Sequence, residues 1–379
     1  MAVMADACEV PVEAPKPRVT WKTVLFPIIG VAAFFLFIYL FQVDIPTIIA
    51  TAQTADLSLY ALAAILSIAE VFFYSVSWRV LLNFLNIKLS MVKAYLFVWY
   101  GIFLDIIIPA ESVSGEAVRV YLIQREKGIS SCGPSVASLV THRLLGMAMN
   151  VAILFVGMGL LFVEGQASGL ILNLILFLAA GITAVLVLLI VFSFKEEWSL
   201  KVINGLVHFA EVLTRGRWKG LTKIKEDACR ITKSFHDSMK KFGRNPRPLV
   251  LSLLGLTVTW VLSLSVAYLV FLSLRTPVSW SLILITSAIV LAVKSIPLGI
   301  PFEVGLPEIT MTTLYTSFGV PAGISATATI LNRIITLWLR FFIGLGAQQW
   351  LDLKSALTVC IDDANTSQKP ESTQAPTGK

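Results

Sequence analysis

Two stretches of the sequence place glutamate and arginine within very apolar surroundings. The first holds Glu116 and Arg143, and the second, much later in the chain, holds Glu308 and Arg333. Charged side chains at membrane depth are costly, so they occur mainly where they pair with one another or serve a charged ligand. The chemistry that these residues indicate is therefore ion pairing, the binding of a charged group, or both in turn.

The two stretches share one layout, which indicates an internal repeat. Gly115 precedes Arg143 by 28 residues, and Gly305 precedes Arg333 by the same 28. Each copy begins with a proline-rich segment, a glycine and a glutamate, continues as a short apolar helix, and ends in an apolar helix that carries the arginine. We interpret the rest of the chain as support for this repeat.

Three more charged residues extend the two candidate sites. Glu116 and Arg119 are three residues apart, a spacing that also fits a simple pair on a helix surface. Arg119 lies near the expected membrane interface, so its guanidinium could instead extend toward water. The candidate substrate-binding set is Arg143, Arg333, Glu116, Glu308, Arg119, Glu111 and Glu303.

A purely structural role is the alternative for these residues. Arg143, for example, could be the fixed ion-pair partner of Glu116 or of Asp105. His142, next to it, could relay protons or could be a histidine satisfied between helices. A second tier of candidates shares the same isolation in apolar sequence: Glu70, Asp105, Lys294 and Arg340.

The composition indicates a membrane protein. The 379 residues are 56% hydrophobic and 14% charged, with a mean hydropathy of +0.82, whereas a soluble domain carries about 25% charged residues. The four cysteines form no CxxC pair and the three histidines are far apart, so neither a disulfide framework nor a zinc site is indicated. We expect no metal and no cofactor.

The apolar segments predict an all-α polytopic membrane protein, with six full transmembrane helices and two re-entrant helical hairpins in inverted repeats. A full span needs about 20 apolar residues. Six segments reach that length with their flanks: 24–41, 57–78, 135–163, 169–194, 249–274 and 322–350. Each hairpin, at 94–128 and 279–319, is a pair of short segments broken by Pro and Gly. Such backbone is tolerated at membrane depth only under a cover of protein or beside a wet cavity, and two pairs of ordinary spans are the alternative.

These segments divide the chain into two membrane halves, 21–194 and 248–350, joined by a basic connection at 195–247. The connection holds thirteen Lys or Arg and six Asp or Glu, a net charge of +7. Two amphipathic runs within it, 203–213 and 221–242, fit helices that lie on an anionic membrane face, although a plain helical connector explains them as well. The flanks, 1–20 and 362–379, lack core-forming residues and are predicted to be disordered.

The distribution of positive charge predicts the topology, because basic loops stay on the cytoplasmic side. Lys16, Arg18 and Lys22 place the N-terminus there, and the basic connection falls on the same side. The first hairpin then enters from the cytoplasm and the second from outside, an inversion that is typical of secondary transporters. Acidic residues precede the first apolar run, which argues against a cleaved signal peptide. We expect that span to remain and both termini to be cytoplasmic.

These motifs resemble the flippase-like family that includes the transmembrane region of lysylphosphatidylglycerol synthases, the UPF0104-type integral membrane proteins. The family shows a Pro…Gly-Glu-x-x-Arg segment and then an arginine in the next apolar helix, here 109–119 and Arg143. The family also shows a late segment that contains proline, glycine and a glutamate, and a further arginine after it. Here these are 297–308 and Arg333. The second motif departs from the family at three positions that are more often glycine: Ile300, Phe302 and Glu303.

The resemblance implies movement of a polar-headed lipid from one leaflet to the other, and no synthesis. The synthases carry a soluble aminoacyl-transfer domain after their membrane region. Only about 30 residues follow the last predicted span here, so we expect that domain to be absent. The lipid would be a membrane phospholipid or a polyprenyl-linked lipid.

A lipid phosphate needs a polar route through hydrocarbon, and the planar fork of arginine suits it. We therefore expect Arg143 and Arg333 to bind the phosphate from opposite sides of a central cavity. Glu116 and Glu308 would pair with them when the site is empty, or would bind a cationic headgroup. Backbone N–H groups near the starts of the hairpin helices could add donors.

No enzyme activity is expected, because no HxxxH, GxSxG or paired-aspartate motif occurs. Two other functions stay open: a membrane enzyme acting on a lipid phosphate, and a non-transporting partner that recruits a separate lipid- or glycan-modifying enzyme through 195–247. Besides the lipid, the candidate partners are a second copy of the chain and a separate synthase or glycosyltransferase, and no nucleic acid. The expected location is a prokaryotic plasma membrane.

Overall fold

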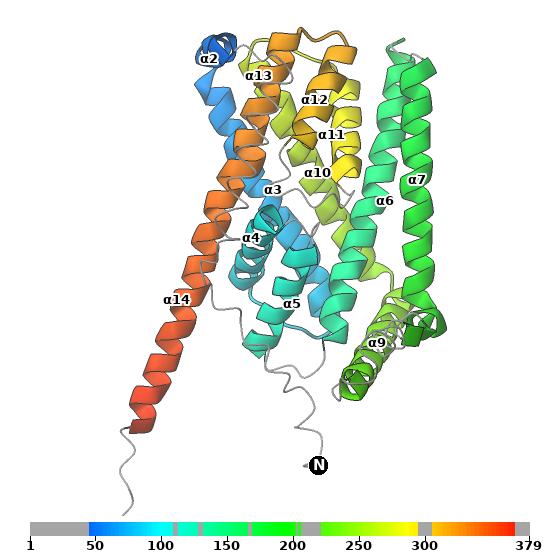
Figure 1. The fold of residues 1–379 in the computed structure, drawn as a ribbon, viewed down its shortest axis with the longest axis vertical. Helices are drawn as coiled ribbons and strands as arrows, with labels where there is room; N and C mark the ends of the chain where they lie inside the picture. The colour runs from blue at the N-terminus through cyan, green and yellow to red at the C-terminus, as the bar shows by residue number, and fades with distance from the viewer. Residues whose placement is uncertain are drawn as a thin grey trace, which may run out of the picture.

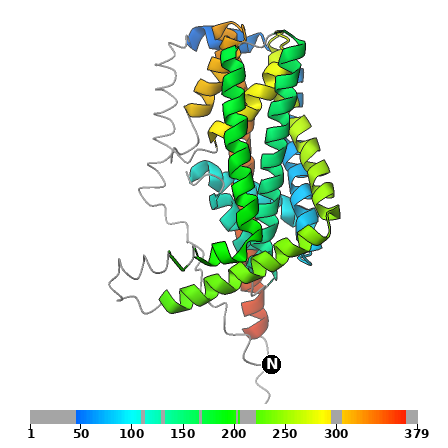
Figure 2. The same ribbon diagram turned by 90° about the vertical axis from the view of Figure 1, so that its right-hand side faces the viewer.

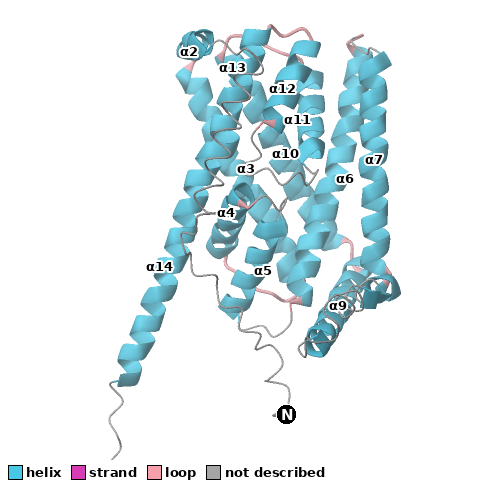
Figure 3. Cartoon of the chain, in the orientation of Figure 1, coloured by secondary structure: helices cyan, strands magenta, loops and turns pink. Residues whose placement is uncertain are grey.

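The computed structural model describes seven segments of the chain, and these are helical apart from short connections, with no strand among them (Figure 3). The described residues are 45–108, 113–127, 132–165, 169–201, 204–205, 221–294 and 305–367. The first predicted span, 24–41, and the flank 1–20 lie outside them. The all-helical fold that the composition and periodicity predict is therefore confirmed over the described residues.

Among the described residues, five helical segments are long and apolar enough to cross a membrane, and they coincide with five of the six predicted full spans. They are α3 (Leu57–Phe84), α6 (Gly133–Val163), α7 (Gly169–Phe194), α10 (Arg247–Ser273) and the run from Ala322 to Leu353. Phe177 of α7 and Leu254 of α10 are among many large apolar side chains that are mostly exposed. An extensive apolar outer surface of this kind fits contact with lipid tails.

The chain enters the described bundle at its upper end in Figure 1, where α2 (Ile45–Gln53) lies beside the start of α3. Asp56 caps α3, since its carboxylate accepts hydrogen bonds from the backbone N–H groups of Ser58 and Leu59. Such a cap satisfies N–H groups that the first helical turn leaves unpaired. From this fixed start α3 descends to the lower end of the bundle.

Two pairs of short helices lie between the long ones, where the sequence predicts the two hairpins. The first pair is α4 (Met91–Ile107) and α5 (Val113–Lys127), and the second is α11 (Trp280–Lys294) and α12 (Leu306–Ser317). Figure 1 shows the first pair in the lower half of the bundle and the second pair in the upper half. The residues that join the partners, 109–112 and 295–304, lie outside the described part of the chain.

Small polar residues let α3 and α10 pack closely. Ser77 Oγ lies 2.7 Å from the backbone oxygen of Ser252 and 2.8 Å from its Oγ. A Cβ atom on Gly255 would come within 2.9 Å of Ser77 Cβ, so only glycine permits this approach. Interfaces of small and hydroxyl-bearing residues are common between membrane helices, where apolar burial alone drives little association.

The helix α9 (Leu221–Arg244) lies across the lower end of the bundle (Figure 2). Its apolar stripe, which includes Met239 and Phe242, is buried against Leu81 of α3 and Ala137 of α6. The second amphipathic run of the basic connection is thus a helix, as its periodicity predicts. Most of the first run lies in 206–220, outside the described residues.

The last helical run differs from the single span that the sequence predicts. It consists of α13 (Ala322–Arg333), a π-helical segment η2 (Ile334–Leu339) and α14 (Arg340–Ser367). The prediction that the tail is disordered from residue 362 is wrong for 362–367, which continue α14. No Gly or Pro lies between Gly346 and Pro370, so nothing in the sequence stops the helix there. Residues 368–379 lie outside the described part.

Candidate functional site

The first predicted pair forms between α5 and α6. Arg143 Nη1 donates a hydrogen bond to Glu116 Oε1 at 3.4 Å. Glu116 lies in the first turn of α5, where the positive end of the helix dipole favours a carboxylate. The Arg143 side chain is 33% exposed and that of Glu116 is 23% exposed. The pair is therefore reachable from outside the packed interior.

Asp105, a second-tier candidate, fixes the start of α5 against α4. Asp105 Oδ1 accepts hydrogen bonds from the Gly115 backbone N–H at 2.6 Å and from Ser114 Oγ at 2.8 Å. The Gly115 N–H was a candidate donor to a ligand, and here Asp105 occupies it. A carboxylate that receives N–H groups at a helix N-terminus is a strong cap, so Asp105 has a positioning role for Glu116.

Gly115 is the closest point between the two short helices, which yields a testable prediction. A Cβ atom at Gly115 would lie 2.3 Å from Asp105 Oδ2 and 2.5 Å from the Gly101 carbonyl oxygen. We expect Gly115→Ala to lower the free energy of unfolding by roughly 1–3 kcal/mol, the usual cost of forcing extra atoms into a packed site. Reversible unfolding in mixed micelles measures this change.

Gly146→Ala is the matched control for that measurement. Gly146 lies in α6, and nothing stands within 4 Å of the position that its Cβ would take. Alanine in a helix interior is about 0.5–1 kcal/mol more favourable than glycine, so this variant should be as stable as the wild type or more so. Equal losses in the two variants would contradict the close approach at Gly115.

Arg119 is buried, which corrects the prediction that it extends to the membrane interface. Only 5% of the residue is exposed, and its Nε donates to the Gly115 carbonyl oxygen at 3.2 Å. Its guanidinium carbon lies 5.3 Å from the ring centroid of Trp78 and 6.0 Å from that of Tyr74. These aromatic faces attract the cation and hold it inside. The spacing of Glu116 and Arg119 suggested that these two residues form a surface pair. In the structure, Glu116 accepts its hydrogen bond from Arg143 instead.

The second predicted pair forms between α12 and α13. Arg333 Nε donates to Glu308 Oε1 at 2.5 Å, and the two side chains are only 8% and 3% exposed. The other oxygen, Glu308 Oε2, accepts from the Gly305 backbone N–H at 2.7 Å. Gly305 has a φ of 99°, a conformation that glycine adopts without strain. As at Gly115, a protein carboxylate takes the N–H that we considered for a ligand.

The two pairs match in design and differ in exposure. In each half a glutamate near the start of a short helix meets an arginine of the following helix, and in each half a carboxylate binds the glycine N–H. The pair in the first half is partly open, whereas the pair in the second half is sealed. An accessible pair can exchange its partner for a ligand at modest cost, while a buried pair must first be opened.

A third buried pair joins second-tier candidates that the sequence could not connect. Arg340 Nη2 donates to Glu70 Oε2 at 2.5 Å, and the guanidinium also bonds Ser67 Oγ. Ser263 and Lys294 also interact favourably with the same carboxylate. Glu70 and Arg340 are 270 residues apart, so no local pattern predicts their contact.

The π-helical segment explains how two arginines on one run reach different partners. Arg333 and Arg340 are seven residues apart, which in a continuous α-helix would place them on nearly the same face. The wider turns of η2 between them shift that register. Arg333 consequently meets α12, whereas Arg340 meets α3. π-Helical turns often occur at functional sites, and this one separates two buried pairs.

His142 lies between helices. The residue is buried, its Nε2 is 3.1 Å from Ser77 Oγ, and its ring meets Tyr74 edge to face. These contacts match the interpretation as a histidine satisfied between helices. Among the described residues, no group of three or more His, Cys, Asp or Glu could hold a metal ion. Glu111 and Glu303 lie outside the described residues, so their predicted roles stay predictions.

Comparisons with known proteins place these features in a family. The family model described as lysylphosphatidylglycerol synthase TM region matches residues 27–344. A UPF0104 membrane protein of Pyrococcus horikoshii is 26% identical over 324 residues, which cover 85% of this chain and 95% of that protein. A UPF0104 membrane protein of Methanocaldococcus jannaschii is 24% identical over 334 residues, which cover 87% and 94%. The resemblance inferred from the motifs is confirmed, and both relatives are membrane proteins of archaea.

Proposed function

Because this chain belongs to the family of the lysylphosphatidylglycerol synthase TM region, we propose that it moves a phosphate-bearing, polar-headed lipid between the leaflets of a prokaryotic plasma membrane. The observation that carries this proposal is the duplicated glutamate–arginine pair. One pair is accessible and the other is sealed. The archaeal source of the relatives supports the location.

The short helix pairs are, in this proposal, re-entrant hairpins of two inverted repeats. At 1.5 Å per residue, the 17 residues of α4 span about 26 Å and the 12 residues of α12 about 18 Å. Both fall short of a hydrocarbon core of about 30 Å. The two pairs occupy opposite halves of the bundle (Figure 1), as inverted repeats would place them.

The lower end of the bundle faces the cytoplasm in this proposal. The helix α9 lies there (Figure 2), and it presents a largely basic exposed surface. The exposed basic residues are Lys225, Arg230, Lys233, Lys240, Lys241 and Arg244. Basic segments beside transmembrane helices mark the cytoplasmic side, so α4 and α5 would enter from the cytoplasm and α11 and α12 from outside.

Competition for arginine supplies the chemistry of transport. A phosphate in hydrocarbon lacks the hydrogen bonds that water gives it, and a guanidinium restores two of them in parallel. The headgroup would displace Glu116 from Arg143 on entry, and the released carboxylate would be left for a cationic part of the headgroup. The same exchange at Arg333 and Glu308 would release the lipid on the other side.

The unequal exposure of the pairs supports alternating access. The accessible Glu116–Arg143 pair belongs to the half whose short helices lie at the lower, cytoplasmic end, while the Glu308–Arg333 pair is closed. The structure would then represent the cytoplasm-facing state. Rocking of one repeat against the other would close the first pair and open the second.

Headgroup reorientation in liposomes tests the proposed function. The purified chain would be reconstituted with a trace of fluorescent phosphatidylglycerol, and dithionite would then bleach only the outer leaflet. We expect protein-containing vesicles to lose inner-leaflet fluorescence much faster than protein-free vesicles, because the protein supplies a polar route. A parallel series with a short polyprenyl phosphate distinguishes the two candidate lipid classes. Identical bleaching with and without protein, for both lipids, would reject transport.

A second candidate function, recruitment of a separate lipid- or glycan-modifying enzyme, is favoured by the exposed basic face of α9. Such a face offers ion pairs to an acidic partner. In a pull-down from membranes solubilised in mild detergent, a recruited enzyme would be lost when residues 195–247 are replaced by a neutral linker. Transport without any recovered enzyme would leave only the first function.

A further inference from the structure

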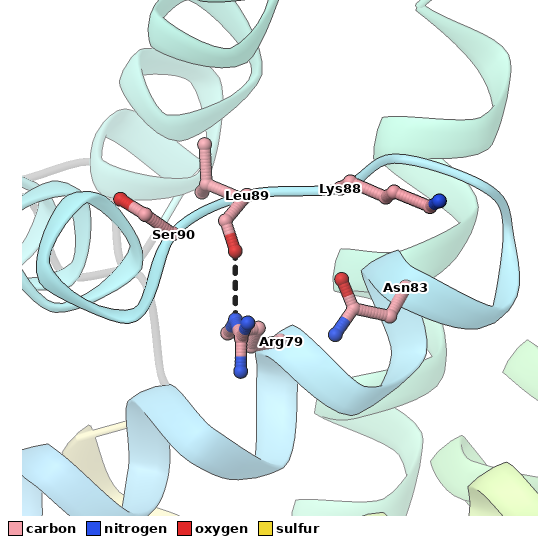
Figure 4. Close-up of a pocket in the computed structure, with 5 residues that line it drawn as sticks. All are labelled: Arg79, Asn83, Lys88, Leu89 and Ser90. Atoms are coloured by element: carbon pink, nitrogen blue, oxygen red, sulfur yellow. Dashed lines mark hydrogen bonds between the residues drawn. The ribbon is translucent and has the colours of Figure 1, made fainter.

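A pocket at the lower end of the bundle has the composition of an anion site. It lies where α3 ends and α4 begins and has a volume of about 450 Å³, within the range of small-ligand sites. Its described lining residues carry two cations, an amide and a hydroxyl, and no carboxylate. They are Arg79, Asn83, Lys88, Leu89 and Ser90 (Figure 4).

The connecting loop is held in a fixed shape. Ile87 and Leu89 are buried, whereas Lys88 and Ser90 between and after them are exposed. The alternation turns two apolar side chains into the bundle and leaves two polar ones at the rim of the pocket, where Ser90 Oγ also accepts the Lys93 backbone N–H as the cap of α4. Asn86 turns the chain with a φ of 65°, a conformation that asparagine adopts more readily than most residues. The pocket is therefore formed before any ligand arrives, which lowers the entropic cost of binding.

Arg79 is oriented toward the pocket by one bond. Its Nε donates to the Leu89 carbonyl oxygen at 2.7 Å, the dashed line in Figure 4. This bond fixes the plane of the guanidinium and leaves its two terminal nitrogens for another acceptor. Within the described part of the chain, no acidic side chain pairs with Arg79 or Lys88. Two unpaired cations beside one pocket attract an anion.

We propose that this pocket binds the phosphate of an anionic phospholipid in the cytoplasmic leaflet. Val92, two residues after Ser90, is an apolar side chain that is 68% exposed. Polar donors and an exposed apolar residue thus follow one another in the sequence at the start of α4, and these are the two kinds of group that a headgroup and its acyl chains contact. None of the lining residues belongs to the predicted substrate-binding set, and the site does not depend on lipid transport.

Native mass spectrometry of the full chain with dioctanoyl phosphatidylglycerol tests the site. We expect the wild type to retain one more lipid than two variants, Lys88→Gln and Asn83→Asp. The first removes a cation, and the second places a carboxylate in the pocket without changing its volume. Both residues are exposed, so the variants should keep the wild-type melting temperature. The affinity of the lost lipid should fall roughly tenfold or more, as for other charge-assisted bonds.

Three controls decide the source and the specificity of binding. Dioctanoylglycerol, which lacks phosphate, should not occupy the pocket, and sn-glycerol 3-phosphate should bind much more weakly than the lipid. The variant Lys233→Gln/Lys241→Gln removes two exposed cations from α9 and should retain as many lipids as the wild type. Equal lipid numbers in the wild type and both pocket variants would overturn the proposal. So would binding of glycerol phosphate as tight as that of the lipid, or an equal loss in the α9 variant.

Discussion

Replacing Arg333 with glutamine is expected to lower the free energy of unfolding by ~3–5 kcal/mol, because it leaves the buried Glu308 carboxylate without its partner. Lipid movement should stop in the same variant, because the proposed phosphate ligand on the exit side is gone. Reversible unfolding in mixed micelles measures the first effect, and headgroup reorientation in liposomes measures the second. The stability loss alone would follow from breaking any buried pair, so a further variant is needed to separate the structural role of Arg333 from its proposed role in transport.

The double variant Glu308→Gln/Arg333→Gln makes that separation. With both charges removed, no carboxylate is left buried without its partner, so most of the lost stability should return, while transport should stay absent. The Glu70–Arg340 pair is the matched control, because it is also mostly buried and lies outside the predicted substrate-binding set. Glu70→Gln/Arg340→Gln should restore both stability and transport relative to Arg340→Gln. Recovery of transport in Glu308→Gln/Arg333→Gln would reduce Arg333 to a structural role.

The spans and the two glutamate–arginine pairs could be predicted because their signals are local. Apolar length identifies a span, and the shared 28-residue spacing aligns Gly115 with Gly305 and Arg143 with Arg333. Glu116 and Glu308 follow those glycines by one and three residues. The structure brings both pairs together as ion pairs. Local signals sufficed here because α5 and α12, which carry the glutamates, are each followed directly by the helix that carries the partner arginine.

The features that could not be predicted depend on contacts between distant segments. Arg119 is held inside by Tyr74 and Trp78 of α3, and its own helix gives no pattern that indicates burial. The pairing of Glu70 with Arg340 joins α3 to the last helical run. The π-helical segment ahead of Arg340 is of a rare helix type, and nothing in the sequence around it indicated the segment.

Arg143→Gln should slow transport while leaving stability nearly unchanged, whereas Arg333→Gln is expected to lower both. The Glu116–Arg143 pair is partly exposed, so its loss should change the free energy of unfolding by only ~0–1 kcal/mol. Transport should nevertheless slow roughly tenfold or more, because a charge-assisted bond to phosphate contributes about 1.5–3 kcal/mol. Arg143→Lys keeps the charge without the planar fork, so it should restore only part of the rate.

The Lys93–Glu126 pair provides the matched control for this prediction. It links α4 to α5, the helix that also carries Glu116, and its side chains are 34% and 32% exposed, against 33% and 23% for Arg143 and Glu116. Lys93→Gln therefore removes another partly exposed ion pair of α5, and it should leave both stability and transport near the wild-type values. If Lys93→Gln slowed transport as much as Arg143→Gln, the hairpin's overall charge would matter and phosphate would have no specific ligand there. If Arg143→Gln transported normally, the entry half of the proposed exchange would be excluded, because no other predicted residue of that half combines a guanidinium with access from outside.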